Sequence, residues 1–359
     1  MRVHHGEAES KSALLDRRDW LWLMLGGVIG SGGAVTARSV QSPAQDTQSP
    51  AQDPLAPPQE RGQHKPLPTP EAELAAVREK LDRAKIGPLT TVHSAHYLAI
   101  GDAPRAFMAI TLADCEQLAA DYQRYFDSLG FHVHQPDRPL IAVIFRDDRS
   151  FGKFFHLPPL FTAGVYVRAT NALHVFDWKN VPMKPRASHL NMETLAHEAM
   201  HQLTFNTGLL NREGDIPRCI VEGLGTHAES RKTMGPSNLG RLNLMRMDDL
   251  AKKQKRVPWM PVRELITNDA VLRAGTASLT MDSREAARIL LSYAQSWLLV
   301  YYLIKEPAAL PRFRKYLQAI APRDKSDRRI EDAQSHLGDL DQLDQELRRY
   351  AIRLQLSLR

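Results

Sequence analysis

The order of the periodic segments constrains the fold of this 359-residue chain most strongly. Strand-like patterns occur only before Trp178: an apolar run at 139–147, rich in β-branched residues, and two alternating runs at 163–178 around a turn at Thr170–Asn171. Helical spacing precedes them at 71–87 and 112–129 and continues almost to the C-terminus after Trp178. Strands first and helices afterwards predict an α+β fold, with an N-terminal mixed β-sheet and a mainly helical C-terminal half.

The first 37 residues have the pattern of an export signal. Arg17 and Arg18 precede a segment at 20–37 that carries no charge, and Val35-Thr36-Ala37 resembles a signal-peptidase site. Paired arginines before a modest apolar segment are similar to a twin-arginine signal. We therefore expect an exported protein, periplasmic or extracellular, that meets the membrane only through this segment if it is not cleaved. A general secretory signal, an uncleaved anchor and a buried helix remain alternatives.

Residues 38–70 form a Pro- and Gln-rich segment with a near repeat of QSPAQD and almost no large apolar side chain. Such a segment cannot bury enough surface to offset the entropy lost on ordering, so we expect a disordered linker. The remainder divides into an α+β part at 71–190, which contains the sheet, and a helical part at 191–359 of the same domain.

Composition excludes some classes of function. The formal net charge is +6, but the basic residues are spread along the chain beside acidic ones, which argues against a nucleic-acid partner. Only Cys115 and Cys219 are present, so there is neither a disulfide framework nor a cysteine metal site. One disulfide between them and two buried free thiols both remain open, and the oligomeric state is not predicted.

The segment TLAHEAMHQL at 194–203 carries the main chemical signal. We expect a helix from Met192 to Phe205 that Asn191 caps. On such a helix His197 and His201 lie one turn apart on one face and can bind the same metal, while Glu198 lies beside them as a base. Chance alone supplies this pattern in some histidine-rich chains, so a third ligand is needed.

Glu222 in the stretch IPRCIVEGLGTHAES is the candidate third ligand. We expect a second helix with Pro217 in its first turn and an inward face of Cys219, Glu222 and Thr226. A carboxylate among small and apolar neighbours is predicted to be buried, and a buried carboxylate requires a cation. The small residues Gly223 and Gly225 would let this helix pack closely on the first.

An HExxH motif followed after about twenty residues by a glutamate on a second helix resembles the gluzincin zinc metallopeptidases. The wider stretch LAHEAMHQLTFNTGL…IPRCIVEGLGTHAES looks like the peptidase-MA-like domains of bacterial domain-of-unknown-function family 1570, over roughly residues 90–320. The resemblance implies a zincin-like fold and a peptide or protein substrate. It also implies Zn²⁺ as the cofactor, His197, His201 and Glu222 as its ligands, and Glu198 as the catalytic general base.

The sequence departs from the gluzincin pattern beside the ligands. Many gluzincins have an aspartate four residues after the glutamate ligand, which orients the first histidine, and Thr226 occupies that position here. Cys219 occupies a position where such domains often have a bulky aromatic residue. Gluzincins also commonly place a Tyr or His over the oxyanion, and Tyr293 and Tyr301 are the candidates.

The resulting hypothesis is an exported zinc metallopeptidase that hydrolyses amide bonds. The alternatives are a non-catalytic envelope binding or scaffolding module on the same fold, and a zinc hydrolase of a non-peptide amide. The hairpin at 163–178 offers either a peptide-binding edge strand or an ordinary edge. We expect His189 to lie outside the helix and His227 to point away from Glu222, so neither is assigned as a ligand.

Overall fold

The computed structural model describes residues 68–157, 164–177, 187–230, 239–274 and 283–357. The expected export signal at 1–37 lies outside these residues, and so does the expected linker up to residue 67. Within the described ranges, no helix has both the length and the apolar character that crossing a membrane requires.

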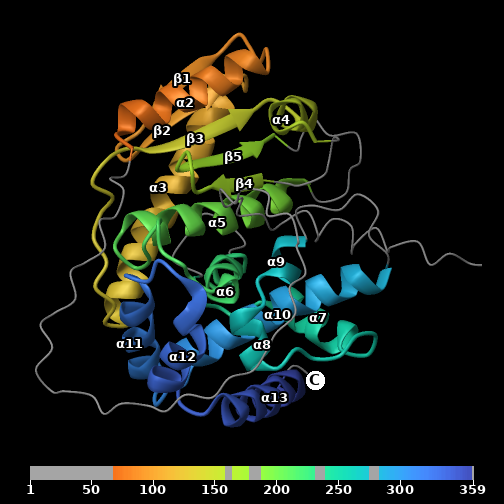
Figure 1. Cartoon of the computed structure of the whole chain (residues 1–359). Coiled ribbons are helices and arrows are strands. Elements are labelled where there is room, and N and C mark those ends of the chain that lie inside the picture. The colour runs from red at the N-terminus through yellow and green to blue at the C-terminus, as the bar shows by residue number, and fades with distance from the viewer. Residues whose placement is uncertain (1–67, 158–163, 178–186, 231–238, 275–282, 358–359) are drawn as a thin grey trace, which may run out of the picture.

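A five-stranded mixed sheet lies in the N-terminal half, as the sequence predicts (Figure 1). Its order is β1-β2-β3-β5-β4, with β2, β3 and β5 parallel and the two outer pairs antiparallel. The strands are β1 (Thr90–His93), β2 (Tyr97–Gly101), β3 (Leu140–Phe145), β4 (Gly164–Val167) and β5 (Ala172–Phe176). Strand β4 is therefore an edge strand, and the turn expected at Thr170–Asn171 connects it to β5.

Every side chain of the central strand β3 is buried, which explains its continuous apolar sequence. Ile141 and Phe145 face a smaller core with α2 and α4, whereas Ala142 and Ile144 belong to the main core with α3 and α5. Helices therefore cover both faces of the sheet. These helices are α2 (Pro70–Arg83), α3 (Arg105–Ser128), α4 (Asp148–Phe155) and α5 (Ala187–Asn206).

The β1–β2 hairpin is not predicted from the sequence. Only Val92 of β1 is buried, so this strand carries too little apolar periodicity to be recognised. The start of α2 is better marked, because the Thr69 side chain caps it and Pro70 occupies its first turn. Helix α3 begins before the expected residue 112, directly after Pro104.

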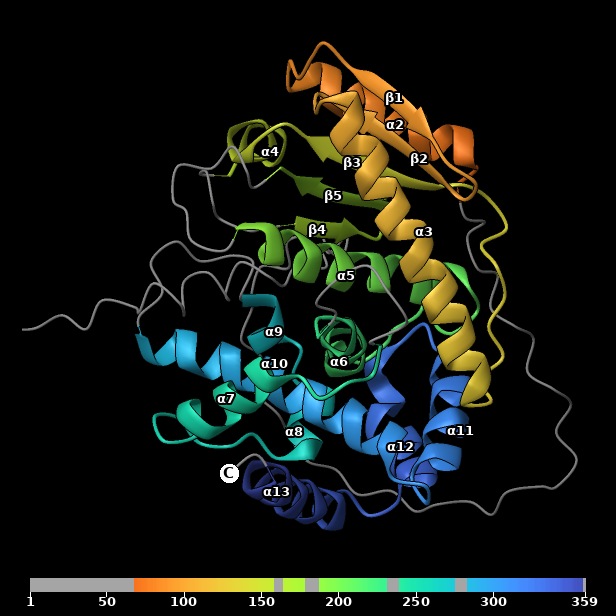
Figure 2. The same ribbon diagram turned by 180° about the vertical axis from the view of Figure 1, so that it is seen from behind.

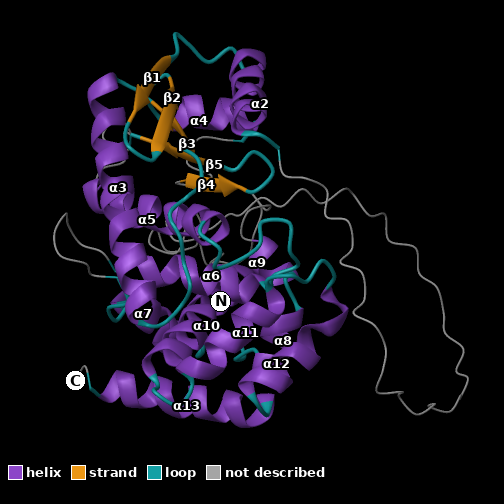
Figure 3. Ribbon diagram, turned by 90° about the vertical axis from the view of Figure 1, so that its left-hand side faces the viewer, coloured by secondary structure: helices purple, strands orange, loops and turns teal. Residues whose placement is uncertain are grey.

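The C-terminal half is helical, which confirms the α+β class, and the side view separates the strands from these helices (Figure 3). Helix α10 is buried on nearly all sides and forms the centre of this half. Helix α10 spans Ser283–Lys305. The other helices of this half are α6 (Arg218–Ala228), α7 (Leu244–Lys253), α8 (Val262–Thr267), α9 (Ala270–Ala274), α11 (Leu310–Ile320), α12 (Arg329–Leu337) and α13 (Leu340–Leu356).

Helix α5 lies between the sheet and the helical half, and α3 extends from the sheet to the level of α11 (Figure 2). Helix α5 begins at Ala187, so Asn191 lies inside the helix rather than at its cap. Position 189 is also helical, contrary to expectation. The expected division of the folded part at residues 190 and 191 falls within this helix.

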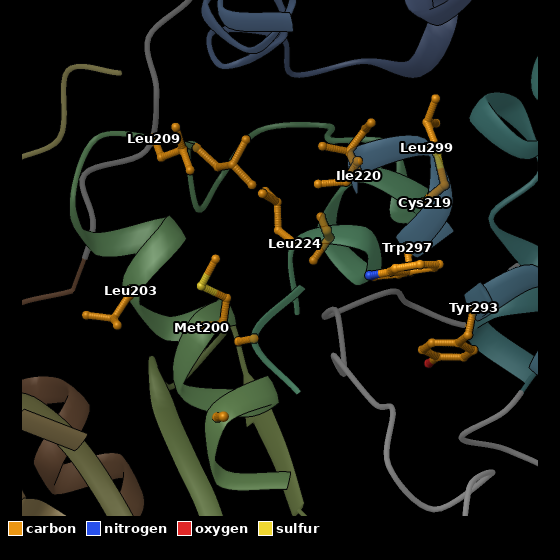
Figure 4. Close-up of a cluster of buried hydrophobic side chains, with 14 of the residues drawn as sticks. Met200, Leu203, Leu209, Cys219, Ile220, Leu224, Tyr293, Trp297 and Leu299 are labelled. Carbon is orange, nitrogen blue, oxygen red and sulfur yellow. The ribbon is translucent and has the colours of Figure 1, made fainter. Parts of the chain in front are cut away.

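The apolar contact between α5, α6 and α10 holds the two halves together. Met200 of α5, Leu224 of α6 and Trp297 of α10 belong to one buried cluster (Figure 4). Cys219 of α6 and Cys115 of α3 also belong to this cluster. Both cysteines are buried and no disulfide joins them, which resolves the question that the sequence leaves open.

Candidate metal centre

Helix α5 is anchored to the sheet beside its second histidine. The Gln202 side chain donates hydrogen bonds to the backbone carbonyls of Ile141 in β3, at 3.0 Å, and Asn171, at 2.8 Å. Gln202 is completely buried, so these bonds form where water does not compete. They fix the rotation of α5 about its axis and thereby direct the neighbouring His201 away from the sheet.

His197, His201 and Glu222 converge at one point between α5 and α6. The two Nε2 atoms lie 3.0 Å apart, and Oε2 of Glu222 lies 3.2 Å from Nε2 of His197 and 3.5 Å from Nε2 of His201. All three side chains are fully buried. The structure thus brings together the three residues that the sequence predicts as ligands.

This arrangement suits a metal ion. Ligand atoms about 2.1 Å from a tetrahedral zinc ion are roughly 3.4 Å from one another, close to the three separations found here. Two imidazoles and one carboxylate are a ligand set that zinc accepts. Neighbouring nitrogen lone pairs repel unless a proton or cation lies between them, so the group could hold a metal ion.

One stripe of α6 faces the two histidines, and it differs from the predicted stripe. It comprises Arg218, Glu222, Gly225 and Glu229, at the spacing of successive helical turns. Cys219 and Thr226, which we expected on this face, lie on another stripe: Cys219 belongs to the apolar cluster, and the Thr226 hydroxyl donates to the Glu222 carbonyl. Periodicity around Glu222 alone is compatible with either stripe, because both contain it.

The two glycines of α6 have different roles. A Cβ atom at Gly225 would lie 2.7 Å from Cε1 of His201 and 2.9 Å from Cε1 of His197, so its absence makes room for the imidazoles. A Cβ atom at Gly223 would instead lie 2.5 Å from the carbonyl oxygen of Ser296 on α10. Close packing on α5 is thus confirmed for Gly225 and wrong for Gly223.

Glu229 provides a carboxylate that orients the first histidine of the motif, His197. Its Oε1 lies 2.9 Å from Nδ1 of His197, and a carboxylate can only accept, so Nδ1 donates and Nε2 points to the other ligands. Arg246 of α7 binds both carboxylate oxygens of Glu229, at 2.9 and 2.7 Å, and Asn243 donates to it at 2.9 Å. An acid therefore orients the first histidine, although Thr226 occupies the usual position of that acid.

Glu198 lies beside the three converging atoms and is held by the edge strand. The backbone N–H of Tyr166 in β4 donates to its Oε2 at 2.7 Å, and its Oε1 has no hydrogen-bond partner within the described part of the chain. Burial raises the pKa of Glu198 to about 8, although the charges of His197 and Arg218 and the bond from Tyr166 oppose that rise. This carboxyl group can therefore exchange a proton near neutral pH.

Tyr166 is itself fixed by a buried polar network. Its hydroxyl donates to Oδ1 of Asn171 at 2.7 Å, and the Asn206 amide donates to the same oxygen at 2.8 Å. Asn171 has φ 52°, the left-handed conformation that asparagine tolerates better than most residues. The β4–β5 turn therefore connects the end of α5 to the strand that holds Glu198.

The charges of the site are strongly coupled. Burial alone would lower the pKa of His197, but Glu222 and Glu229 outweigh it and raise that pKa to about 10. For His201 burial prevails and lowers the pKa to about 4. Burial would raise the pKa of Glu222, but the two histidines and Arg218 lower it below its ordinary range. Glu222 thus stays ionised and attracts a cation.

Tyr293, one of the two tyrosines predicted to lie over the oxyanion, is near the charged residues of the site. Burial and the charge of Glu222 raise its pKa well above the ordinary value, so the phenol stays protonated, and Arg246 lies 5.4 Å from its ring. Tyr301 packs against Trp297 at 5.0 Å between ring centroids and against His227 at 6.1 Å, away from the ligands. Of the two tyrosines, Tyr293 is the one on which the charge of Glu222 acts.

The remaining histidines of the described chain do not join this group. His227 points away from Glu222, as predicted, and its Nε2 lies 2.9 Å from the Tyr125 hydroxyl. The side chain of His189 lies outside the described residues, and so do His4, His5 and His64. Strand β4 lies at the edge of the sheet, as predicted. The backbone N–H of Tyr166 on this strand donates to Glu198, so this N–H does not offer a free donor to an added peptide strand.

Fold and site together define an α+β protein with a buried two-histidine, one-glutamate group that could hold a metal ion. The family model "Protein of unknown function (DUF1570)" matches residues 191–325, which include the HExxH motif and all of α6. This match supports the resemblance to that family. It does not include the sheet, to which we expected the resemblance to extend. Comparison with curated proteins gives no match.

Several residues around the site were not predicted from the sequence. Glu229 lies two turns beyond Glu222, and an acid at that spacing is a signal that a search limited to one turn misses. Arg218 directly follows Pro217 on the stripe of Glu222, so helical spacing alone could have identified it. Tyr166 acts through its backbone, which leaves no signal in the sequence.

Proposed function

We propose that this protein is a zinc-dependent metallopeptidase that hydrolyses amide bonds. One observation carries the proposal: Glu198 presents a carboxylate oxygen without a hydrogen-bond partner in the described chain, next to three converging ligand atoms. A site that only held a structural ion would have no chemical need for this additional buried acid. The spacing of the motif and its resemblance to the gluzincins support the same conclusion.

His197, His201 and Glu222 would hold the ion. When bound, zinc supplies Lewis acidity, which makes water more acidic and polarises a carbonyl group. Glu229 keeps Nδ1 of His197 protonated, so that Nε2 stays available as a ligand. Arg246 keeps Glu229 ionised, because its charge and hydrogen bonds lower the pKa of Glu229 against the effect of burial.

Glu198 would be the general base. Its Oε1 accepts the proton of the attacking water and afterwards delivers it to the leaving amine, while the Tyr166 N–H holds Oε2 in place. Tyr293 would donate a hydrogen bond to the oxygen that becomes negative during attack. The reaction needs no covalent intermediate, and the described site contains no activated serine or cysteine that would form one, since burial raises the pKa of Cys219.

The N-terminal segment supports a location outside the cytoplasm. Its paired arginines, uncharged stretch and small residues before residue 38 are typical of an export signal. N-terminal sequencing of the protein recovered from periplasmic and culture fractions tests this part of the proposal. We expect a mature N-terminus close to residue 38, and an N-terminus at Met1 would contradict cleavage.

Metal analysis and peptide cleavage test the activity. We expect about one zinc ion per chain in the wild type, strong loss of zinc in Glu222→Ala, and retention of zinc without cleavage in Glu198→Gln. Equal zinc in the wild type and Glu222→Ala would contradict the ligand assignment. Equal cleavage of a peptide library by the wild type and Glu198→Gln would contradict the mechanism. Zinc binding with no cleavage of peptides would favour a binding module or another amide substrate.

A further inference from the structure

Arg218 is a buried cation at the end of the stripe that carries Glu222. It is the first residue of α6, one turn before Glu222, and only 8% of its surface is exposed. Glu229 and Gly225 lie on the other side of Glu222 along the same stripe. The guanidinium group therefore lies beyond the metal ligands, on the side opposite the orienting carboxylate.

The guanidinium donors of Arg218 lack acceptors. Neither Nε nor Nη2 makes a hydrogen bond within the described part of the chain, although both atoms are buried. Nε lies 3.4 Å from Oε1 of Glu222, near enough for attraction between the charges, but no hydrogen bond forms. Leaving buried donors of a charged group without acceptors is costly, so folding alone does not explain this arrangement.

Other arginines of this protein show what a satisfied pair looks like. Arg246 donates Nε and Nη2 to the two oxygens of Glu229 at 2.9 and 2.7 Å, and Arg323 donates the same two atoms to Asp332 at 2.8 and 2.7 Å. Arg329 binds Asp215 in the same way, at 2.8 and 2.7 Å. Arg218 differs from these three, because the same pair of atoms binds no carboxylate of the described chain. In Arg212 this pair also lacks a partner, but its Nη1 donates to Glu73 at 2.6 Å.

The charges near Arg218 favour an anionic ligand once a cation occupies the site. Oε1 of Glu222 lies 3.4 Å from Nε of Arg218, and a cation bound to Glu222 would offset its negative charge, so the charge of Arg218 would then be unbalanced. A planar guanidinium edge with two parallel donors matches the two oxygens of a carboxylate. A neutral carbonyl offers one oxygen to both donors and no negative charge.

We propose that Arg218 binds a carboxylate of the substrate next to the scissile amide bond, through Nε and Nη2. This inference rests on the proposed peptidase function and specifies its substrate class. Two sources provide the same group: the free C-terminal carboxylate of a short peptide, and the side chain of an aspartate or glutamate next to the cleaved bond. The first makes the protein an exopeptidase, and the second makes it selective for acidic peptides.

Binding measured by isothermal titration calorimetry tests the proposal without turnover. The zinc-loaded full chain is titrated with N-acetylalanine and with its amide, and separately with end-blocked dipeptides that contain either glutamate or glutamine. We expect one of the two acids to bind the wild type at least about tenfold more tightly than its neutral partner. Which acid does so identifies the source of the carboxylate.

Variants then assign the preference to Arg218. Arg218→Met should remove it, and Arg218→Lys, which keeps the charge but not the paired donors, should retain only part of it. Arg288→Met is the matched control, because the Arg288 side chain is 52% exposed and lies on α10. Zinc content is measured in each variant, since Arg218 also neighbours Glu222.

Equal binding of acid and neutral ligands by the wild type overturns the proposal, even if Arg218→Met does not fold. An undiminished preference in a zinc-loaded Arg218→Met also overturns it, because the metal or another group then holds the carboxylate. Peptide cleavage without a preference for acids would leave the proposed function intact and remove this inference. A preference for acids that depends on Arg218, without any cleavage of peptides, would leave the carboxylate-binding role of Arg218 intact and contradict the proposed peptidase function.

Discussion

Oε1 of Glu229 lies 2.9 Å from Nδ1 of His197 and connects the candidate metal ligand to a buried ion pair with Arg246. The carboxylate comes from a position two turns beyond Glu222 on the same helix. It performs the orienting role that gluzincins commonly assign to an aspartate one turn beyond their glutamate ligand. An acid therefore contacts His197 here, although Thr226 occupies the position at which many gluzincins have that aspartate.

Replacing Glu229 should weaken metal binding. We expect Glu229→Gln to lower zinc affinity by about 10- to 100-fold, because a neutral amide stabilises the orientation and basicity of His197 less well. Competition with a chromophoric chelator measures the affinity, and circular dichroism establishes that the variant folds. Asp249→Asn is a matched control, since it alters another acid near Arg246 that does not touch His197. Unchanged zinc affinity in Glu229→Gln would contradict the role of Glu229.

Alanine at the two glycines of α6 should separate metal binding from folding. Gly225→Ala pushes a methyl group against both imidazoles, so we expect zinc affinity to fall more than tenfold. Gly223→Ala pushes instead against the Ser296 backbone, so it should destabilise the fold by about 1–3 kcal/mol with little effect on zinc affinity. Chelator competition and urea unfolding of both variants test this difference. The same profile for both would show that Gly225 has no special relation to the histidines.

Removing the phenol oxygen near the site should affect the reaction rather than zinc binding. If Tyr293 stabilises the oxyanion, Tyr293→Phe should lower kcat by about 10²- to 10³-fold, as loss of one such donor does in other hydrolases. Tyr301→Phe is the control on the same helix, because its ring packs against Trp297 and away from the ligands. Steady-state kinetics on a cleaved peptide measures both. Loss of activity in Tyr301→Phe alone would reverse the assignment.

The Asn171 side chain should contribute measurably to stability. Asn171→Ala leaves the Tyr166 hydroxyl and the Asn206 amide without their shared acceptor and should cost about 1–3 kcal/mol for each group left unsatisfied. Asn171→Gly also loses the side chain but tolerates φ 52°, so it should be more stable than Asn171→Ala by about 1 kcal/mol. Urea unfolding measures both variants, and wild-type stability in Asn171→Gly would show that the network is dispensable.

His174 should make the protein sensitive to acid. Burial and then the charge of Lys80 lower its pKa to about 3 in the folded chain, whereas the unfolded value is about 6.5. The unfolded chain therefore takes up a proton first, and stability that is complete above pH 6.5 is lost as the pH falls towards 3. The slope from this one group is about 1.4 kcal/mol per pH unit.

His174→Phe tests the contribution of this histidine. Its ring lies among Phe154 and Phe155, so a phenylalanine suits the surroundings. We expect the free energy of unfolding of this variant to fall less steeply between pH 6.5 and 4.5 than that of the wild type. Parallel curves over this range would show that His174 does not cause the acid sensitivity. Surface carboxylates titrate in both proteins and cancel in the comparison.

The sequence by itself determined the class of the fold and the residues at the centre of the site. Strand patterns before helical ones gave the α+β class, because the periods 2 and 3.6 are local properties of a strand and a helix. The spacing of His197 and His201 placed both on one face of α5 for the same reason. Glu222 was recognisable because a buried acid among small and apolar residues requires a positive partner.

Only the tertiary structure decided which side of each helix meets which neighbour. The stripe with Arg218 and Glu229, and the stripe with Cys219 and Thr226, both contain Glu222 at helical spacing, so the rotation of α6 cannot be read from its periodicity. That rotation depends on packing against α5 and α10, where Gly225 and Gly223 permit close approach. The Tyr166 backbone N–H reaches Glu198 only after the sheet and α5 have packed together. Side-chain spacing within one element is a local property, whereas contacts between elements form only when distant segments of the chain meet.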